Sequence, residues 1–251
     1  MSDSTPARRS DAVELPIVTR RYAHITALQA ETPGVMHVVL EVQRPGLRWL
    51  PGQWVDLQIT LDGEAHIGGY SMISPWDPDT PTRLELAIRR SRHRVSAWMH
   101  DEAQVGDQVI LTGGDGPCVY DPEIEPDAVW VAGGIGITPL LAMVKAFVAR
   151  PEIEGRGVLM YSVKSPEAHP FSEVIDALAA DARLQVHTTF TESGPEGTHR
   201  GRLSAHDILA VCPSERAPIY LSGPPAMVDD LEQQLWVQGV SADRIRLERW
   251  W

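Results

Sequence analysis

The chain has 251 residues, 43% of them hydrophobic, and a formal net charge of −12 at pH 7. That apolar content argues against a disordered chain, and the acidic balance argues against a nucleic-acid partner, because binding phosphates requires a basic surface. The length favours two domains of ordinary size.

The N-terminal residues MSDSTPARRSDAVELP are polar and lack the apolar segment of a secretory signal, and no later run is long enough to span a membrane. Cys118 and Cys212 are the only cysteines. Two cysteines so far apart favour neither a disulfide framework nor a zinc site nor a four-cysteine iron–sulfur cluster. We therefore expect a soluble cytoplasmic protein that holds no metal.

Residues 1–15 are expected to form a flexible tail, and a series of short strands follows it. Alternating or β-branched runs predict strands at residues 24–29, 35–42, 53–60, 84–88 and 108–111. Turn pairs such as Pro45-Gly46 and Pro51-Gly52 separate them, and one helix is expected at 94–102. Short strands at this spacing predict a small antiparallel β-barrel over residues 16–125.

From residue 126 to residue 251 the pattern changes to strands that alternate with helices. Strands are predicted at 129–132, 157–163, 184–191, 219–222 and 245–248, with helices at 139–149, near 171–178, after a capping box formed by Ser204 and Asp207, and at 226–238. This alternation predicts a parallel sheet. The predicted fold is thus an antiparallel barrel domain followed by an α/β parallel-sheet domain.

The first strand of the second domain runs into a glycine-rich loop, Gly133-Gly134-Ile135-Gly136-Ile137-Thr138-Pro139. We expect Thr138 to cap the following helix and Pro139 to occupy its first position. A strand, a loop without side chains and a helix N-terminus form an anion site, for which a pyrophosphate is the natural occupant. Because the pattern is not G-x-G-x-x-G, a closely packed turn without a ligand is the alternative.

A second motif lies in the barrel, where Gly68-Gly69 precedes Tyr70-Ser71. A tyrosine held by glycines beside a serine could stack on a flat ring while the hydroxyl donates a hydrogen bond to the ring's edge. A core tyrosine next to a turn is the alternative.

Four motifs in fixed order resemble the ferredoxin–NADP reductase superfamily, and the resemblance covers nearly everything after the tail. They are Pro51-Gly52-Gln53, the Tyr70-Ser71 element, the glycine-rich loop, and Ser222-Gly223-Pro224-Pro225-Ala226-Met227. The chain looks most similar to the subgroup called oxidoreductase NAD-binding domain-containing proteins, which shares the Gly-Gly-aromatic-Ser element and the ending Glu248-Arg249-Trp250-Trp251.

The resemblance implies a flavoprotein oxidoreductase that passes a hydride from NADH or NADPH to FAD and electrons to a separate acceptor, a protein or a small molecule. It implies that the flavin is held by Tyr70, Ser71, Ile88, Arg89 and Ser96, with Trp250 over its face. It implies that the nucleotide is held by Gly133, Gly134, Gly136, Thr138, Gly223, Pro224 and Met227. The candidate catalytic residues are Ser71, Ser222, Glu248 and Trp250.

Three positions depart from the family pattern. Gly68 replaces an arginine that anchors flavin phosphate, His93 replaces a glycine three residues before Ser96, and Ser222 replaces a cysteine. Losing a charge-assisted hydrogen bond is worth about 1.5–3 kcal/mol, or roughly ten- to a hundredfold in affinity, so weaker FAD retention is expected. Arg89 or Arg94 could replace the anchor. The alternative is that these two belong to a solvated basic loop.

The nucleotide and the overall function leave alternatives open. The ribose end is expected near residues 161–165 and 191–192, where Glu192 favours NADH and Lys164, Arg200 and Arg202 favour NADPH. Of the two, NADH is the expected donor. A nicotinamide-nucleotide-binding or regulatory module with a degenerate flavin site is the main alternative to an enzyme, and a flavin-free dehydrogenase is a third.

Overall fold

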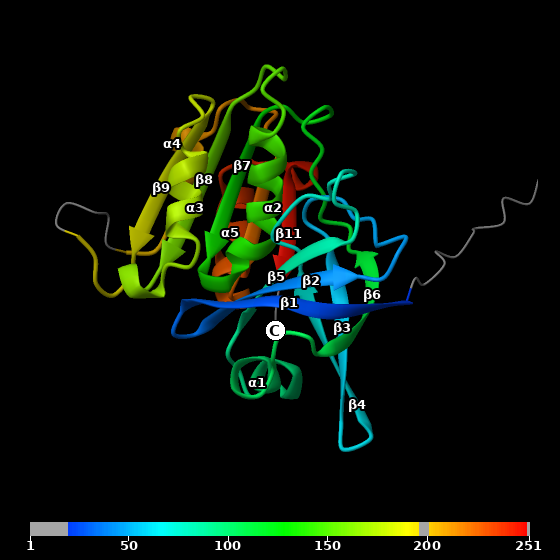
Figure 1. Cartoon of the computed structure of the whole chain (residues 1–251). Helices are drawn as coiled ribbons and strands as arrows, with labels where there is room; N and C mark the ends of the chain where they lie inside the picture. The colour runs from blue at the N-terminus through cyan, green and yellow to red at the C-terminus, as the bar shows by residue number, and fades with distance from the viewer. Residues whose placement is uncertain (1–19, 196–200, 250–251) are drawn as a thin grey trace, which may run out of the picture.

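The structure is a computed structural model that describes residues 20–195 and 201–249. The expected tail, residues 1–15, lies outside the described residues, as does Trp250. The chain folds into two lobes, one after the other (Figure 1). No helix in the described ranges is long and apolar enough to cross a membrane. Those ranges also contain no cluster of His, Cys, Asp and Glu side chains suited to a metal ion.

The first lobe, here called the barrel lobe, is a six-stranded antiparallel sheet with one helix. Its elements are β1 (Arg20–Thr32), β2 (Val35–Val42), β3 (Trp54–Leu61), β4 (Glu64–Ser71), β5 (Arg83–Arg89), α1 (Arg94–Asp101) and β6 (Gln108–Asp115). The strand order is β4-β3-β6-β1-β2-β5. A bridge links Met72, directly after the edge strand β4, to Leu86 in the other edge strand, β5, so the sheet curls toward a barrel around an apolar core.

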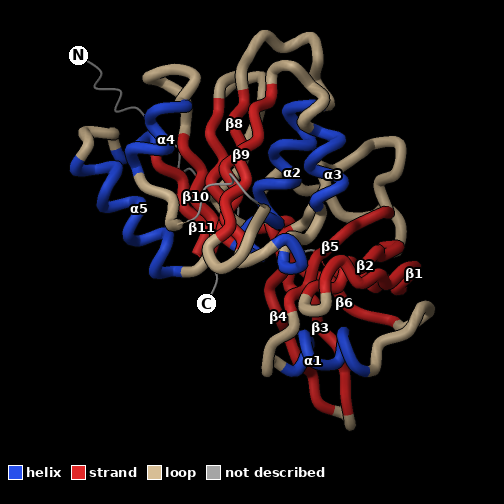
Figure 2. The backbone as a smooth tube through the Cα atoms, turned by 90° about the vertical axis from the view of Figure 1, so that its left-hand side faces the viewer, coloured by secondary structure: helices blue, strands red, loops and turns tan. Residues whose placement is uncertain are grey.

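The second lobe, here called the α/β lobe, is a five-stranded parallel sheet between two helical layers (Figure 2). Its strands are β7 (Ala128–Gly133), β8 (Gly157–Val163), β9 (Leu184–Phe190), β10 (Ile219–Gly223) and β11 (Ile245–Arg249). Its helices are α2 (Ile137–Val148), α3 (Ser172–Leu178), α4 (Ala205–Val211) and α5 (Pro225–Val237), with short 3-10 turns at Gly134–Gly136, Pro166–Ala168 and Ala242–Arg244. Alternate residues of β7 face opposite layers, α2 and α3 on one side and α4 and α5 on the other.

In the strand order β11-β10-β7-β8-β9 all strands are parallel, but the direction in which successive strands are added to the sheet reverses once. From β7 the chain builds outward through β8 and β9, and then returns to place β10 on the other side of β7. The carboxyl ends of the parallel strands point toward the barrel lobe (Figure 1). In open α/β sheets, ligands bind in the crevice outside the carboxyl ends at such a reversal, which here lies between β7 and β10.

The predicted fold is confirmed, with two local corrections. The strand β4 was not predicted, because two glycines and little alternation weaken its strand pattern. Thr138 does not cap α2, and Pro139 is not its first residue: the chain enters a 3-10 turn at Gly134, and these two are the second and third residues of the helix. The Thr138 hydroxyl donates to the Ile135 carbonyl at 3.0 Å. The positive φ of 52° at Gly134 lets the chain turn immediately after β7.

A polar junction connects the lobes beside a shared apolar cluster. His37 Nε2 lies 2.8 Å from Glu85 Oε2, both in the barrel lobe. The His37 ring also packs edge-on against Phe171, just before α3, at a centroid distance of 5.8 Å. Glu31 accepts a hydrogen bond from the Phe171 backbone N–H at 3.3 Å. Burial lowers the pKa of Lys145, which interacts with the carboxylates of Glu85 and Glu31 from α2. The junction therefore fixes the position of one lobe against the other through charged and aromatic groups.

We expect Glu85→Gln to destabilise the fold by about 3 kcal/mol at pH 7. The hydrogen bond with His37 lowers the pKa of Glu85 from 4.5 to about 2, against the opposing effect of burial, and Arg83 and Lys145 contribute further lowering. Because the folded pKa is below the unfolded one, this stability is present above pH 4.5 and is lost as the pH falls toward 2. Urea unfolding at pH 7 and pH 3 measures the difference, which should shrink at the lower pH. The exposed Glu64 provides the control, since Glu64→Gln should change stability little at either pH; an equal effect of both variants would contradict the prediction.

Candidate functional site

The loops after β7 and β10 lie side by side at the point where the order of strand addition reverses. Their backbones are in close contact. A Cβ atom on Gly136 would lie 2.3 Å from the Ser222 carbonyl oxygen and 2.5 Å from the Gly223 Cα atom. A Cβ atom on Gly133 would lie 2.6 Å from Met227 Sδ. Gly223 has φ 156°, inside the region that favours glycine. The predicted glycines therefore lie together with Gly223 and Met227. A side chain at Gly136 would force the two loops apart, whereas one at Gly133 would have to displace the Met227 side chain.

Gly134 has the opposite surroundings. A Cβ atom there would meet no heavy atom within 4 Å, so this part of the loop faces open space. The Tyr161 hydroxyl donates to the Gly134 carbonyl oxygen at 2.9 Å and holds the loop from behind. Neither the 3-10 turn nor α2 has a side-chain cap or an acidic residue in its first turn. The loop thus keeps an open face with positive helix-end polarity, which suits a pyrophosphate.

A cleft of about 670 Å³ begins at this loop and runs across the carboxyl ends of the strands. Gly133, Gly134, Pro224 and Met227 line one part of it. Its barrel-lobe wall is Arg89 together with the β1–β2 turn, residues 32–35. Its far part is lined by the end of β8, by residues that follow β8 and β9, and by a residue before α4, which are Ser162, Val163, Lys164, Ser165, Glu167, Thr191 and Arg202. A cleft of this size and polarity can take an elongated nucleotide.

The residues expected at the ribose end are only partly in the cleft. Lys164 and Arg202 line it, whereas Tyr161 is buried and supports the glycine loop instead. Glu192 forms an ion pair with Lys164 at 2.9 Å, with both side chains largely exposed. Arg200 lies outside the described residues.

Each lobe contributes a buried serine hydroxyl that has no hydrogen-bond partner. The Ser71 side chain, at the end of β4, and the Ser222 side chain, in β10, are buried, and neither oxygen finds a donor or acceptor among the described residues. A buried hydroxyl without a partner is unfavourable by about 1–3 kcal/mol, and native structures rarely leave one unless a ligand completes it. Among the described residues five other buried side chains also lack a partner, such as Trp130 in the core, and Ser71 and Ser222 are the two that lie within the predicted site motifs.

Tyr70 lies beside Ser71 and packs partly against the barrel core. Burial raises the pKa of its hydroxyl to about 12, so the group stays protonated and can donate a hydrogen bond at neutral pH. The carboxyl end of β5 brings Ile88 and Arg89 to the same side of the lobe, Ile88 buried and Arg89 exposed. A flat aromatic group could be held here between apolar contact and polar edges.

Ser96 and Arg94, at the start of α1, have different surroundings. The Ser96 hydroxyl donates to the Arg89 carbonyl at 2.7 Å and accepts from the Ser91 N–H at 2.8 Å. Ser96 therefore fixes the shape of the loop between β5 and α1, and its hydroxyl is already engaged. Arg94 is exposed. The free N–H groups of the first turn still give this helix start a positive end.

Glu248 in β11 pairs in register with Ser222 in the neighbouring strand. Burial raises the pKa of the Glu248 carboxyl to about 7, so it can gain or lose a proton near neutrality. Burial, with a further contribution from Glu248, raises the pKa of the Cys118 thiol to about 12. A carboxyl that titrates near pH 7, next to a glycine turn, is suited to proton transfer.

Two neighbours of the predicted site residues were not predicted from the sequence. Cys118 belongs to no motif, and His93 was noted only as a departure from a pattern. Only the fold places them beside Glu248 and Gly68 respectively.

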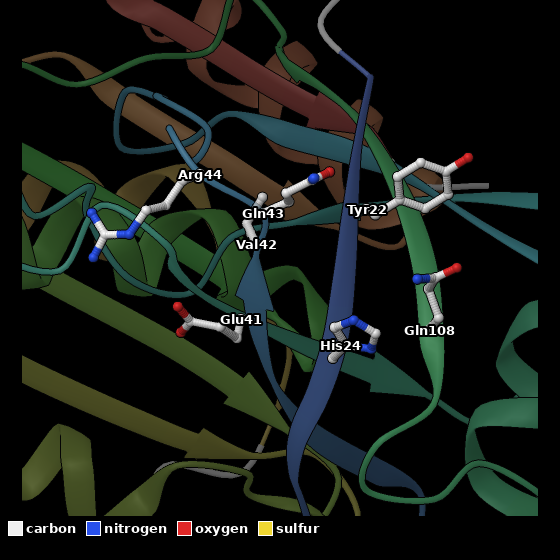
Figure 3. Close-up of a pocket in the computed structure, with 7 residues that line it drawn as sticks. All are labelled: Tyr22, His24, Glu41, Val42, Gln43, Arg44 and Gln108. Carbon is white, nitrogen blue, oxygen red and sulfur yellow. The ribbon is translucent and has the colours of Figure 1, made fainter.

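A second hollow, of about 320 Å³, lies on the outer face of the barrel lobe (Figure 3). Its lining comes from β1, β2, β6 and the loop after β2, and consists of Tyr22, His24, Glu41, Val42, Gln43, Arg44 and Gln108. No predicted site residue lines it, so the cleft between the lobes remains the candidate site.

Comparison with known proteins gives consistent matches. Residues 130–233 match the family described as Oxidoreductase NAD-binding domain. The chain is 30% identical to Oxidoreductase NAD-binding domain-containing protein 1 of Danio rerio, over 98% of this chain and 100% of that protein. Among solved structures it is similar to the flavohem-like FAD/NAD-binding domain of nitric oxide dioxygenase from Vibrio cholerae, with a TM-score of 0.81, 22% identity, and coverage of 92% of this chain and 98% of the other.

A second similar structure is the flavohemoglobin of Malassezia yamatoensis with bound FAD and heme, with a TM-score of 0.78, 21% identity, and coverage of 93% of this chain and 60% of the other. These two structures establish the fold. The Danio rerio protein, which the chain matches over its full length, establishes the family. The chain belongs to the oxidoreductase NAD-binding domain-containing protein 1 family and has the two-lobed fold of FAD/NAD-binding reductase modules.

Proposed function

We propose that this protein is a flavin-dependent oxidoreductase that transfers a hydride from NADH or NADPH to bound FAD and passes electrons to a separate acceptor. Residues 16–125 would hold the flavin and residues 126–251 the nucleotide. The observation that carries the proposal is the pair of buried, unpartnered hydroxyls, Ser71 in one lobe and Ser222 in the other. The FAD in the similar flavohemoglobin structure supports the choice of cofactor.

The barrel lobe would hold the flavin through side chains on β4 and β5. The Tyr70 ring would lie against the flavin, and the Ser71 hydroxyl would gain its missing hydrogen bond near the flavin N5 atom. Ile88 and Arg89 would extend this surface along β5, and the start of α1, with Arg94 and Ser96, would face the phosphates. Trp250 would cover the flavin face until the nicotinamide replaces it. A bound flavin would supply the chemistry, accepting a hydride and releasing electrons singly or in pairs.

The α/β lobe would bind and orient the reduced nucleotide. The open face of the loop at Gly134 would receive the pyrophosphate, with Gly133, Gly136 and Thr138 shaping the loop and the helix start behind it. Gly223, Pro224 and Met227 would position the nicotinamide, since they close the same loop from the β10 side. Lys164 and Arg202 supply positive charge at the far end, while Glu192 neutralises Lys164, so both NADH and NADPH are proposed donors.

Glu248 would exchange the proton that accompanies the electrons, because its raised pKa lets it carry a proton near pH 7. Ser222, opposite Glu248 in register, would orient the nicotinamide through its hydroxyl. No other acid or base is required, since hydride transfer depends chiefly on alignment.

The visible spectrum of the freshly purified protein tests the proposal. We expect a flavin band, either on purification or after adding FAD or FMN, that bleaches under anaerobic conditions when NADH or NADPH is added. The nucleotide that bleaches it faster identifies the donor. A protein that stays colourless after flavin is supplied would contradict the proposed function.

The missing arginine at Gly68 favours one alternative, a flavin-free protein that binds nicotinamide nucleotide and acts through a partner. The same measurement separates the two functions when NADH binding is followed by fluorescence. Nucleotide binding without a flavin band supports the alternative.

A further inference from the structure

The basic run between β5 and α1, residues 89–94, divides into side chains with different surroundings. Arg90 forms a two-pronged ion pair with Asp101, at 3.1 and 2.7 Å. Arg89 lines the nucleotide cleft beside Gly133 and Gly134. Arg92 and Arg94 are exposed, and none of the hydrogen bonds or ion pairs of the described residues connects their side chains to β4. Arg89 lies on the barrel-lobe wall of this cleft, and none of the hydrogen bonds or ion pairs of the described residues joins its side chain to β4 either.

His93 differs from these arginines because its ring reaches β4. A Cβ atom on Gly68 would lie 3.1 Å from His93 Cε1 and 2.8 Å from the Tyr70 hydroxyl oxygen. Two side chains therefore fill the space beside Gly68: His93, the N-cap residue of α1, and Tyr70 of β4. Two departures that are 25 positions apart in the sequence, Gly68 and His93, occupy a single place in the fold.

The N-terminus of α1, beside Gly68, has no side-chain cap that would keep an anion away. His93 is the residue before the first helical turn, and its side chain makes no capping hydrogen bond to that turn. Its backbone N–H donates to the Ser91 hydroxyl at 3.2 Å, and Ser96 holds the same loop from inside. The backbone of His93 is therefore fixed, while its imidazole ring has no hydrogen-bond partner among the described residues. The nearby Tyr70 hydroxyl is a second donor without a partner there.

We propose that His93, together with the Tyr70 hydroxyl, is the anchor for the phosphate end of the flavin in place of the arginine that Gly68 lacks. The inference rests on the proposed function and names the contact that this chain uses for it. An imidazole N–H, a phenol O–H and the free N–H groups of a helix start converge beside Gly68, and all of them are donors that a phosphate accepts. Glycine at position 68 leaves room for both side chains, which a larger residue there would have to displace.

The test is the affinity of the apoprotein for riboflavin, FMN and FAD, measured by quenching of flavin fluorescence. Riboflavin has the same ring system and no phosphate, so a phosphate anchor affects only the other two. We expect His93→Ala to weaken FMN and FAD binding roughly ten- to a hundredfold and to leave riboflavin and NADH binding unchanged. Arg92→Ala is the matched control: it removes a charge from the same exposed loop and should leave all four affinities near those of the wild type.

A second variant tests the same place without removing either donor. Gly68→Ala pushes a methyl group into the Tyr70 hydroxyl and the His93 ring, so we expect the same selective loss of FMN and FAD. The double variant Gly68→Arg/His93→Gly should recover their binding, because it exchanges one anchor for another in the same space.

Two results would overturn the inference. One is FMN binding by His93→Ala as tight as that of the wild type, and the other is an equal loss of riboflavin, which would indicate packing against the ring system. Failure of the wild type to bind any flavin would instead refute the proposed function itself.

Discussion

Replacing Gly136 with alanine is expected to lower the free energy of unfolding by about 3 kcal/mol or more and to abolish nucleotide binding. The added Cβ atom would lie 2.3 Å from the Ser222 carbonyl oxygen and 2.4 Å from its carbon, and both are backbone atoms at the carboxyl end of β10. Because these backbone atoms cannot move aside by rotating a side chain, the loops after β7 and β10 would have to separate to make room for the added methyl group. Urea unfolding and titration with NADH, followed by protein fluorescence, measure the two effects.

Gly134 in the same loop supplies a matched control. Its Cβ position is open, so Gly134→Ala meets only the strain of a left-handed backbone, about 1–2 kcal/mol at φ 52°. We expect this variant to remain folded, with a smaller loss of stability than Gly136→Ala. Equal stability of the two variants would show that close packing between the loops is not what requires glycine at position 136.

Glu248→Gln is expected to lower NADH-driven reduction of an electron acceptor about hundredfold at pH 7 and to remove a pH dependence centred near 7. The wild-type profile should follow the Glu248 pKa of about 7. The variant should lose this dependence, because a glutamine amide does not titrate in this pH range. Glu41→Gln, on the outer face of the barrel lobe, is the control and should retain the wild-type profile. A profile that persists unchanged in Glu248→Gln would exclude Glu248 as the titrating group.

The same substitution should have the opposite effect on stability. The folded pKa of Glu248 is raised above the unfolded value of 4.5, so the folded state loses stability as the pH rises from 4.5 through 7. Glu248→Gln is therefore expected to be more stable than the wild type at pH 8, with no difference near pH 4. Thermal unfolding at the two pH values checks this, and a variant that is less stable at pH 8 would contradict it.

Much of the fold could be predicted from the sequence because its signals are local. Strand periodicity, the capping box of Ser204 and Asp207, and the glycines after β7 each act over a few residues, and the structure confirms them. β4 could not be predicted because it is stabilised by its pairing with β3 rather than by its own composition. Thr138 was misplaced because the chain starts its turn at Gly134, using a backbone conformation that the sequence pattern does not encode.

The candidate site was predictable in its parts but not in its assembly. The glycine loops and the Tyr70-Ser71 element have motifs, and their order in the chain indicates the family. The contact between Gly68 and His93, and the influence of Glu248 on Cys118, join positions distant in sequence. Such contacts depend on how β4 meets α1 and how β11 meets the segment before β7, which no local pattern specifies.

The reversal of strand order has a consequence for synthesis of the chain. β7 and β10 are neighbours in the sheet, yet 85 residues separate the end of one from the start of the other, so the ribosome makes the glycine loop long before its partner. A nascent chain that ends before β10 would leave β7, buried in the finished protein, as an unpaired apolar edge prone to aggregation. Stop codons between the end of β9 at Phe190 and the start of β10 at Ile219 should accordingly yield insoluble fragments rather than a shortened soluble protein.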